Sequence, residues 1–307
     1  MNSKWTNESI PDLTGKIVIV TGANSGIGFE AAREFARSGA HVILASRNLD
    51  KAKDALKEIQ VELPQAKAEI IRLDLASINS IQDFVKTFKS NYDKLDILLN
   101  NAGIMMVPHG TTEDGFEKQF GINHLGHFAL TGLMIDYLLK TPGSRVVNVS
   151  SNAHYTGEVN FSDLMYENGE KYNPQKAYSR SKLANLLFTY ELQRRLDARN
   201  AEVIAIAAHP GISNTSLADH FFQRWFLKPI RPLMGVFFQS AAMGALPSIR
   251  AAVDSSVIGG QYFGPDGSGE RSGFPVVVKS NPTSHNLDAA RKLWEISEEL
   301  TGIQYLG

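Results

Sequence analysis

The hydrophobic positions in the first half of the chain alternate between short continuous runs and longer runs at helical spacing. The short runs are rich in β-branched residues and are expected to form buried strands: Ile17–Val20, His41–Ala45, Ala68–Leu73, Leu95–Leu99 and Arg145–Val149. The segments between them carry apolar residues on one helical face: Ser25–Ser38, Leu49–Glu62, Ile78–Tyr92 and Ile122–Leu139. This alternation is typical of βαβ units and predicts a parallel sheet.

The second half of the chain continues the same alternation. The expected elements are a helix Gln175–Ala198, a strand Val203–Ala208, a helix Ser240–Val253, an edge strand Gly260–Phe263 and a closing helix from about Leu287 to Leu300. No internal repeat, low-complexity tract or linker-like shift in composition divides the sequence. We therefore predict one domain over residues 1–307, an α/β fold with a doubly wound, Rossmann-type parallel sheet.

Composition narrows the classes of function. Lys and Arg number 31 and Asp and Glu 32, so the chain lacks the basic excess of a nucleic-acid binder. The absence of cysteine excludes a disulfide scaffold, thiol catalysis and cysteine-ligated zinc, and it fits a cytoplasmic protein. His124 and His127 are three residues apart, but no further ligand gathers near them in the sequence, so no metal site is predicted. No apolar stretch reaches the ~20 residues of a transmembrane helix.

A glycine-rich turn follows the first expected strand and precedes the first expected helix. Its residues are Gly22, Asn24, Ser25, Gly26, Ile27 and Gly28, with the spacing Gly-x-x-x-Gly-x-Gly. Glycines let a backbone approach a pyrophosphate, which the dipole of a helix N-terminus attracts. An ordinary structural turn is the alternative interpretation. The position between strand and helix favours a dinucleotide site.

The residues at the end of the second expected strand indicate which dinucleotide the chain binds. Ser46 and Arg47 stand where NAD enzymes usually place an acidic residue, and Lys51 follows four residues after Arg47. A guanidinium binds a 2′-phosphate in a forked, charge-assisted geometry. A solvated basic residue at the start of a helix is the alternative. We predict NADP(H), with NADPH preferred over NADH.

Tyr178 and Lys182 are four residues apart in the long helix and therefore share one helical face. Together with the glycine-rich turn and Val146–Ser151, this spacing resembles the short-chain dehydrogenase/reductase family along nearly the whole chain. Three further segments resemble its retinol-dehydrogenase-like branch: Ile122–Phe128, His209–Gly211 and Leu293–Ser297. The sequence begins without the N-terminal anchor of membrane-bound retinol dehydrogenases, which argues against retinol itself as the substrate.

The resemblance implies hydride transfer with four catalytic residues. Tyr178 would be the general acid/base, and Lys182 would support it and bind the nicotinamide ribose. A phenol has a pKa of ~10 in a model peptide, which the lysine ammonium and a positive nicotinamide would lower. Ser151 would hydrogen-bond the substrate oxygen, whereas Ser150 is expected to cap a loop. Asn123 would hold a water that links Lys182 to solvent.

The resemblance also implies further cofactor contacts and a mode of assembly. Asp74 and Leu75 would lie near the adenine, Asn101, Ala102 and Gly103 beside the ribose, and Pro210, Gly211 and Thr215 near the carboxamide or phosphates. Family members commonly pair through the helices expected here over Ile122–Leu139 and Gln175–Ala198, but inserted loops can block that contact, so the sequence leaves open whether the chain forms a homodimer.

Two segments interrupt the regular alternation and are expected to be substrate loops, at about 152–174 and 214–239. The first is long for a βα connection and includes His154, Tyr155, Phe161 and Tyr166. The second is rich in Phe, Trp, Leu and Met, which indicates a bulky apolar substrate, a contact with a membrane or partner, or a plain core helix.

The predicted reaction moves a hydride between NADP(H) and the carbonyl or alcohol group of an apolar ketone, aldehyde or secondary alcohol. One alternative is a catalytically silent NADP(H) sensor, although such proteins usually lose the tyrosine or the lysine. The other is a double-bond reductase resembling protochlorophyllide reductase, a family that relies on an active-site cysteine which this chain lacks.

Overall fold

A computed structural model describes residues 4–212 and 239–307. They form one eight-stranded sheet in the order β3-β2-β1-β4-β5-β6-β7-β8. Its strands are β1 Ile17–Thr21, β2 His41–Ser46, β3 Lys67–Arg72, β4 Ile97–Asn100, β5 Arg145–Val149, β6 Ile204–Ala208, β7 Tyr262–Pro265 and β8 Pro275–Val277. Neighbouring strands run parallel except for the antiparallel pair β7–β8. The predicted α/β, Rossmann-type fold is confirmed.

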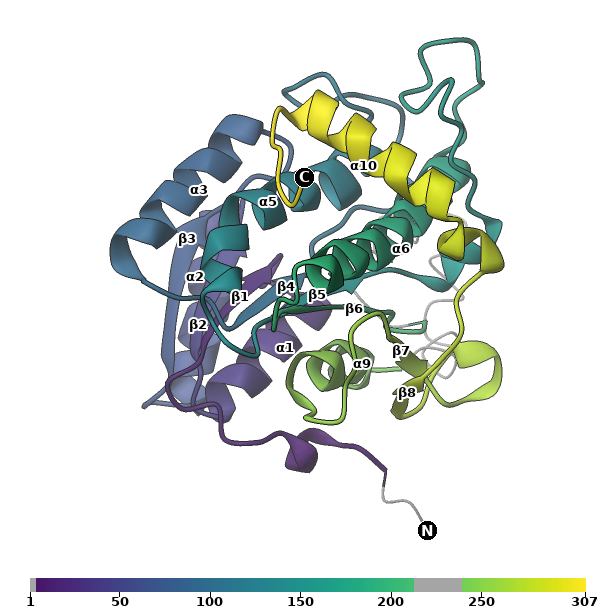
Figure 1. Ribbon diagram of the computed structural model, residues 1–307. Helices are drawn as coiled ribbons and strands as arrows, with labels where there is room; N and C mark the ends of the chain where they lie inside the picture. Colours follow the sequence, from purple (N-terminus) through teal and green to yellow (C-terminus); the bar gives the residue numbers. More distant parts are fainter. Residues whose placement is uncertain (1–3, 213–238) are drawn as a thin grey trace, which may run out of the picture.

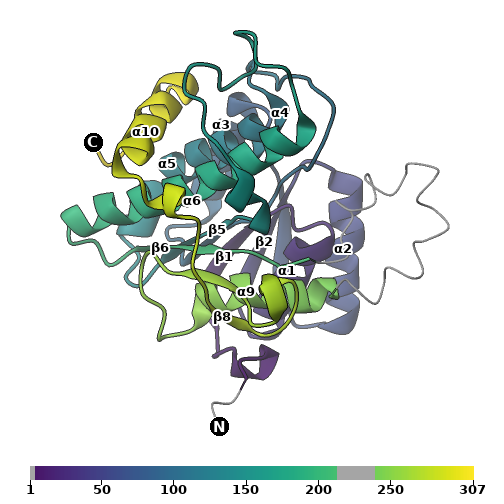
Figure 2. The same cartoon turned by 90° about the vertical axis from the view of Figure 1, so that its right-hand side faces the viewer.

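Helices cover both faces of the sheet (Figures 1 and 2). They are α1 Gly26–Arg37, α2 Leu49–Glu62, α3 Ile78–Asn91, α4 Lys118–Phe120, α5 Gly126–Leu139, α6 Pro174–Ala198, α9 Ala241–Val253 and α10 Leu287–Thr301. Helices α1, α2 and α9 bury one apolar core, while α3, α5, α6 and α10 bury the other. Because the central strands are buried on both faces, their sequences read as continuous apolar runs.

Most expected elements begin and end within two residues of those observed, with two corrections. The strand predicted at Gly260–Phe263 is β7, but it is not the edge strand, because β8 pairs with it from outside. Strand β8 has only three residues and starts at a proline, so its sequence shows no hydrophobic pattern that would predict a strand. The helix expected at Ile122–Leu139 is instead a π-helical turn Gly121–Leu125 followed by α5, and the short helix α4 directly precedes that turn.

The C-terminal segment closes the layer formed by α5 and α6 (Figure 1). The indole of Trp294 on α10 is buried, and the Tyr305 hydroxyl donates to the Phe128 carbonyl oxygen at 3.2 Å. The two helices considered for pairing between copies of the chain therefore have part of their surface covered from within the chain, and the oligomeric state stays open. Within the described ranges, no helix combines the length and apolar character needed to cross a membrane.

Candidate active site

The glycine-rich turn brings three backbone segments into close contact. Gly22 and Gly26 have φ angles of +67° and +59°, a region that side chains disfavour. A Cβ on Gly28 would lie 2.5 Å from the Gly22 carbonyl oxygen and 2.4 Å from Nδ2 of Asn101. Helix α1 starts at Gly26, so its free N–H groups face the same turn. Gly22 and Gly28 therefore have no room for a side chain, and the turn presents bare backbone along the cleft, as phosphate binding requires.

A cleft of about 720 Å³ runs from this turn along the carboxyl ends of the parallel strands. Its lining includes most of the predicted cofactor residues: Gly22, Asn24, Ser25, Gly26, Ile27, Gly28, Ser46, Arg47, Asp74, Leu75, Asn101, Ala102, Gly103, Pro210 and Gly211. Ser151, Tyr178 and Lys182 line the same cleft. Thr215 lies outside the described residues, as does 214–239 apart from Gln239.

Helix α6 carries Tyr178 and Lys182 on one face, both buried. The Lys182 ammonium lies 5.7 Å from the centre of the Tyr178 ring and donates to the Val149 carbonyl oxygen at 3.0 Å. Burial lowers the pKa of Lys182 to about 8. Burial also raises the pKa of Tyr178, and a hydrogen bond with Ser151 opposes that rise. The expected lowering of the Tyr178 pKa is thus not present in the chain alone, because burial outweighs the hydrogen bond with Ser151.

The two adjacent serines have different partners. The buried Ser150 hydroxyl donates to the Lys182 carbonyl oxygen at 2.8 Å, so it ties β5 to α6. The Ser151 hydroxyl accepts the backbone N–H of Ala153 at 3.2 Å and lies against Tyr178 in the cleft. This difference favours Ser151 over Ser150 as the serine available to a substrate.

Asn123 lies in the π-helical turn, buried behind the cleft. Its side-chain oxygen accepts the Ile104 N–H at 2.8 Å, and its amide nitrogen donates to the Ile104 carbonyl and to Ser181, each at 2.9 Å. A Cβ on Gly103 would lie 3.2 Å from Oδ1 of Asn123 and 3.5 Å from Nζ of Lys182. The two side chains therefore face the same stretch of backbone, and the water relay stays a prediction.

Arg47 is the cation at the end of β2. Its side chain is 66% exposed, and Nη1 lies 4.0 Å from Oδ1 of Asp74. The Ser46 hydroxyl donates to the Asn24 side chain at 3.0 Å, which fixes β2 to the glycine-rich turn. Arg47 and Lys51 both line the cleft, so two positive charges gather where the sequence predicts a 2′-phosphate.

His127 is a buried residue outside the cleft lining whose contacts sequence reasoning missed. Burial lowers its pKa to about 4, so the ring is neutral at pH 7 and has one N–H. Nδ1 lies 3.0 Å from the Asn123 carbonyl oxygen, which can only accept, so the proton is on Nδ1 and Nε2 accepts from the Thr21 hydroxyl at 2.9 Å. Thr21 in turn accepts the N–H groups of Asn101 and Ala102. His127 thereby links the cofactor turn to the bend that holds Asn123.

The segment 152–174 does not line this cleft among the described residues. His154 is buried, and Phe161 packs on a cluster of apolar residues from α6 and α10. The apolar residues of the lining include Ile104, Met105 and Val107, together with Ile122 and Ile212. The sequence signal for it was the run Ile104–Val107 directly after Asn101-Ala102-Gly103.

Comparison with known proteins shows the family to which a chain with this fold and cleft belongs. The family model described as short chain dehydrogenase matches residues 16–224. The chain belongs to the short-chain dehydrogenase family. Human retinol dehydrogenase 13 is 41% identical over 297 residues, covering 95% of this chain and 86% of that protein. This short-chain dehydrogenase therefore falls in the retinol-dehydrogenase-like branch, as its sequence predicted.

Solved structures also include proteins similar in fold and sequence to this short-chain dehydrogenase. An uncharacterized protein from Mycobacterium paratuberculosis is 39% identical with a TM-score of 0.82, covering 99% of each chain. A short chain dehydrogenase from Shigella flexneri, solved in complex with NADP, is 25% identical with a TM-score of 0.64 over 82% of this chain and 97% of that one. Family membership makes the protein an oxidoreductase that uses a nicotinamide cofactor.

Proposed function

We propose that the protein transfers a hydride between NADP(H) and the carbonyl or alcohol group of an apolar substrate. The observation that carries the proposal is the presence of Ser151, Tyr178 and Lys182 in the same cleft as the glycine-rich turn. A dinucleotide bound at that turn would extend along a cleft whose far end holds a proton donor. The arrangement fits redox chemistry on a small molecule.

The chain has the groups that NADP(H) needs. The open backbone at Gly22, Gly26 and Gly28 and the N-terminus of α1 would hold the pyrophosphate. Arg47 and Lys51 would bind the 2′-phosphate, and Lys182 the nicotinamide ribose. Asp74, Leu75 and Asn101–Gly103 would border the adenine and ribose, and Pro210, Gly211 and Thr215 the carboxamide or phosphates. When bound, the cofactor supplies or accepts the hydride.

The protein's own part is to place the substrate oxygen and move a proton. In reduction, Tyr178 donates its phenolic proton to the substrate oxygen while Ser151 hydrogen-bonds that oxygen. Burial, which raises the pKa of Tyr178, keeps this proton in place before the reaction. The Lys182 ammonium stabilises the phenolate that forms, and Asn123 would hold the water through which the proton is replaced. In oxidation the same steps run backwards.

The substrate class follows from the lining beyond the catalytic residues. Ile104, Met105 and Val107 present apolar side chains beside the polar catalytic residues. An apolar ketone, aldehyde or secondary alcohol would bury its chain on these residues and direct its oxygen at Tyr178. The similarity to a protein named retinol dehydrogenase supports this class, since retinol is an apolar alcohol.

The test is consumption of NADPH with a panel of apolar aldehydes and ketones, compared with NADH at equal concentration. We expect turnover with each cofactor when a carbonyl is present and none in controls without carbonyl. The kcat/KM should be higher with NADPH than with NADH. NADPH binding without turnover on the panel would contradict the proposed reaction and favour a regulatory NADP(H) sensor.

Reduction is expected to slow as the pH rises through about 8. Burial lowers the pKa of Lys182 to about 8, so the ammonium is present below that pH and is lost above it. Without the positive charge, the phenolate formed during reduction is less stable, and kcat/KM should fall about tenfold per pH unit above the pKa. Measured kcat/KM between pH 6 and 10 checks this, and a profile that stays flat to pH 10 would contradict it.

Replacing Arg47 with alanine is expected to weaken NADPH binding about 10–100-fold and NADH binding less than about twofold, because only NADPH carries the 2′-phosphate. Titration calorimetry with both cofactors measures the two effects. The matched control is Lys53→Ala, an exposed cation on α2 that is paired with Asp50 and absent from the cleft lining. Equal loss for both cofactors in Arg47→Ala would overturn the assignment.

A further inference from the structure

The apolar wall of the cleft is a short segment of irregular backbone. Ile104, Met105 and Val107, defined here as the cleft wall, lie between β4 and α4. Met106 has a φ angle of +51°, which a non-glycine residue adopts only when its surroundings impose it. The position of the wall therefore depends on the groups that hold its backbone.

Two side chains hold the far end of the wall. Oε1 of the buried Gln119 accepts the Met106 N–H at 2.7 Å. Nε2 of Gln119 donates to the Tyr172 hydroxyl at 2.9 Å, and that hydroxyl lies 3.0 Å from the Val107 carbonyl oxygen and 3.1 Å from a carboxylate oxygen of Glu117. The near end, Ile104, is bound by Asn123. Tyr172 thus holds the far end of this wall from outside the β4–α4 region.

Tyr172 is itself fixed to the helix that carries Tyr178. It immediately precedes Asn173, whose side chain caps the N-terminus of α6 by accepting the N–H groups of Gln175 and Lys176. The Pro174 carbonyl oxygen accepts the second amide hydrogen of Gln119 at 2.9 Å. Because the cap fixes where α6 begins, Tyr172 is held beside the start of the helix that carries the proton donor, Tyr178.

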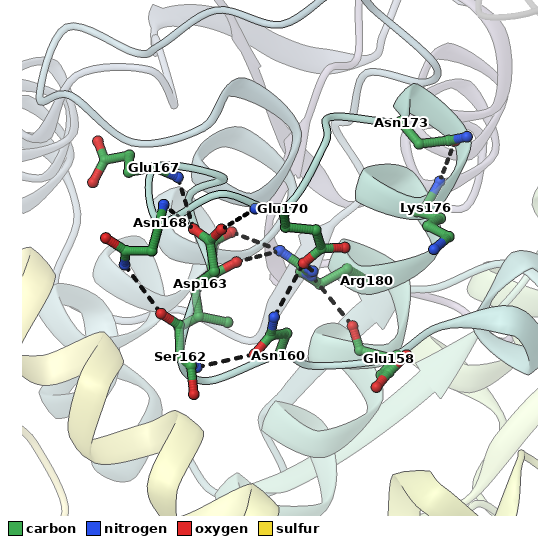
Figure 3. Close-up of polar contacts among 11 residues, drawn as sticks. Glu158, Asn160, Ser162, Asp163, Glu167, Asn168, Glu170, Asn173, Lys176 and Arg180 are labelled. Carbon is green, nitrogen blue, oxygen red and sulfur yellow. Dashed lines mark hydrogen bonds and ion pairs between the residues drawn. The ribbon is translucent and has the colours of Figure 1, made fainter.

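Another part of segment 152–174 is anchored to Arg180 on α6 (Figure 3). Arg180 is two residues from Tyr178, which places its side chain on the other side of the helix. Its buried guanidinium pairs with Glu170 at 2.7 Å and donates to the carbonyl oxygens of Asp163 and Leu164. The Asp163 carboxylate accepts three backbone N–H groups from the same loop. These contacts hold this part of the loop on the catalytic helix.

We infer that Tyr172 is a positioning residue for substrate selectivity: it sets the distance between the cleft wall and Tyr178, and with it which apolar substrates fit. This inference rests on the proposed function, since it assigns the wall to the substrate side of the same cleft. The segment 152–174 contributes to specificity from behind the wall, through one hydroxyl group, rather than by touching the substrate.

The experiment replaces Tyr172 with phenylalanine, which keeps the ring and removes only the hydroxyl. We expect kcat/KM for a long-chain aldehyde such as decanal to fall about tenfold while that for propanal changes less than about twofold, because a small substrate barely contacts the wall. The KM for NADPH should not change. Gln119→Met, which removes both hydrogen-bonding groups at similar volume, should shift the same ratio in the same direction.

The matched control is Tyr166→Phe, in the same segment. The Tyr166 hydroxyl is buried and, among the described residues, has no hydrogen-bond partner, while its ring packs on Tyr172. This variant should leave the decanal-to-propanal ratio unchanged. An unchanged ratio in Tyr172→Phe, or an equal loss for both aldehydes, would overturn the inference.

Hydrogen exchange gives a readout that does not need activity. The amide of Met106 should exchange faster in Tyr172→Phe than in the wild type, with no change in the glycine-rich turn. If the wild-type protein turns over no carbonyl, the proposed function fails, yet faster exchange would still support the link between Tyr172 and the wall. Unchanged exchange would overturn that link whatever the activity.

Discussion

Replacement of Tyr178 with phenylalanine is expected to lower kcat/KM for carbonyl reduction by about 10²–10⁴-fold, the usual contribution of a general acid. The substitution removes the only group that the proposal assigns to donate a proton to the substrate oxygen. The ring stays in its buried position on α6, so the fold and the cofactor turn should not change. Steady-state kinetics with NADPH and an apolar aldehyde, together with NADPH binding by calorimetry, measure both effects.

Tyr190→Phe is the matched control for this variant. Tyr190 lies on the same helix, and its hydroxyl bonds to Ser280 at 2.8 Å outside the cleft. The Tyr190→Phe variant should keep the wild-type kcat/KM for carbonyl reduction. Retention of more than about a tenth of the activity in Tyr178→Phe would remove Tyr178 as the acid. Loss of NADPH binding in that variant would mean that the phenol holds the cofactor rather than the substrate proton.

The parts of the site that the sequence predicted are those encoded by local spacing. The glycine-rich turn joins one strand to the next helix, and the four-residue spacing of Tyr178 and Lys182 places both on one helical face whatever the rest of the fold does. Both patterns lie within a few residues, so they could be recognised before any tertiary contact was known. The sheet followed from the apolar runs for the same reason.

The missed features depend on contacts between distant residues. His127 bonds to Thr21 across 106 positions, and Gln119 bonds to Tyr172 across 53. Neither contact leaves a periodic trace in the sequence. The length and aromatic content of 152–174 indicated a substrate loop, a role that stays a prediction, while the interaction that holds part of this loop on α6 is with the buried Arg180. A basic residue in a helix gives no sign of that.

The C-terminal helix is expected to stabilise the fold strongly through one side chain. Trp294→Ala should lower the free energy of unfolding by about 3–5 kcal/mol, the range for large buried aromatic residues. The indole is 1% exposed and contacts the rings of Phe128, Phe188 and Tyr305, with the Arg195 guanidinium 4.4 Å from its centre. Removing it leaves a cavity between α10, α5 and α6 that these neighbours cannot fill.

Urea unfolding of Trp294→Ala measures this loss, with Leu287→Ala as the control. Leu287 begins the same helix but is 49% exposed, so its truncation should change stability by less than about 0.5 kcal/mol. An equal, small loss in both variants would show that α10 adds little to the core. A large loss for Trp294 alone would mean that the surface of α5 and α6 needs this intramolecular cover.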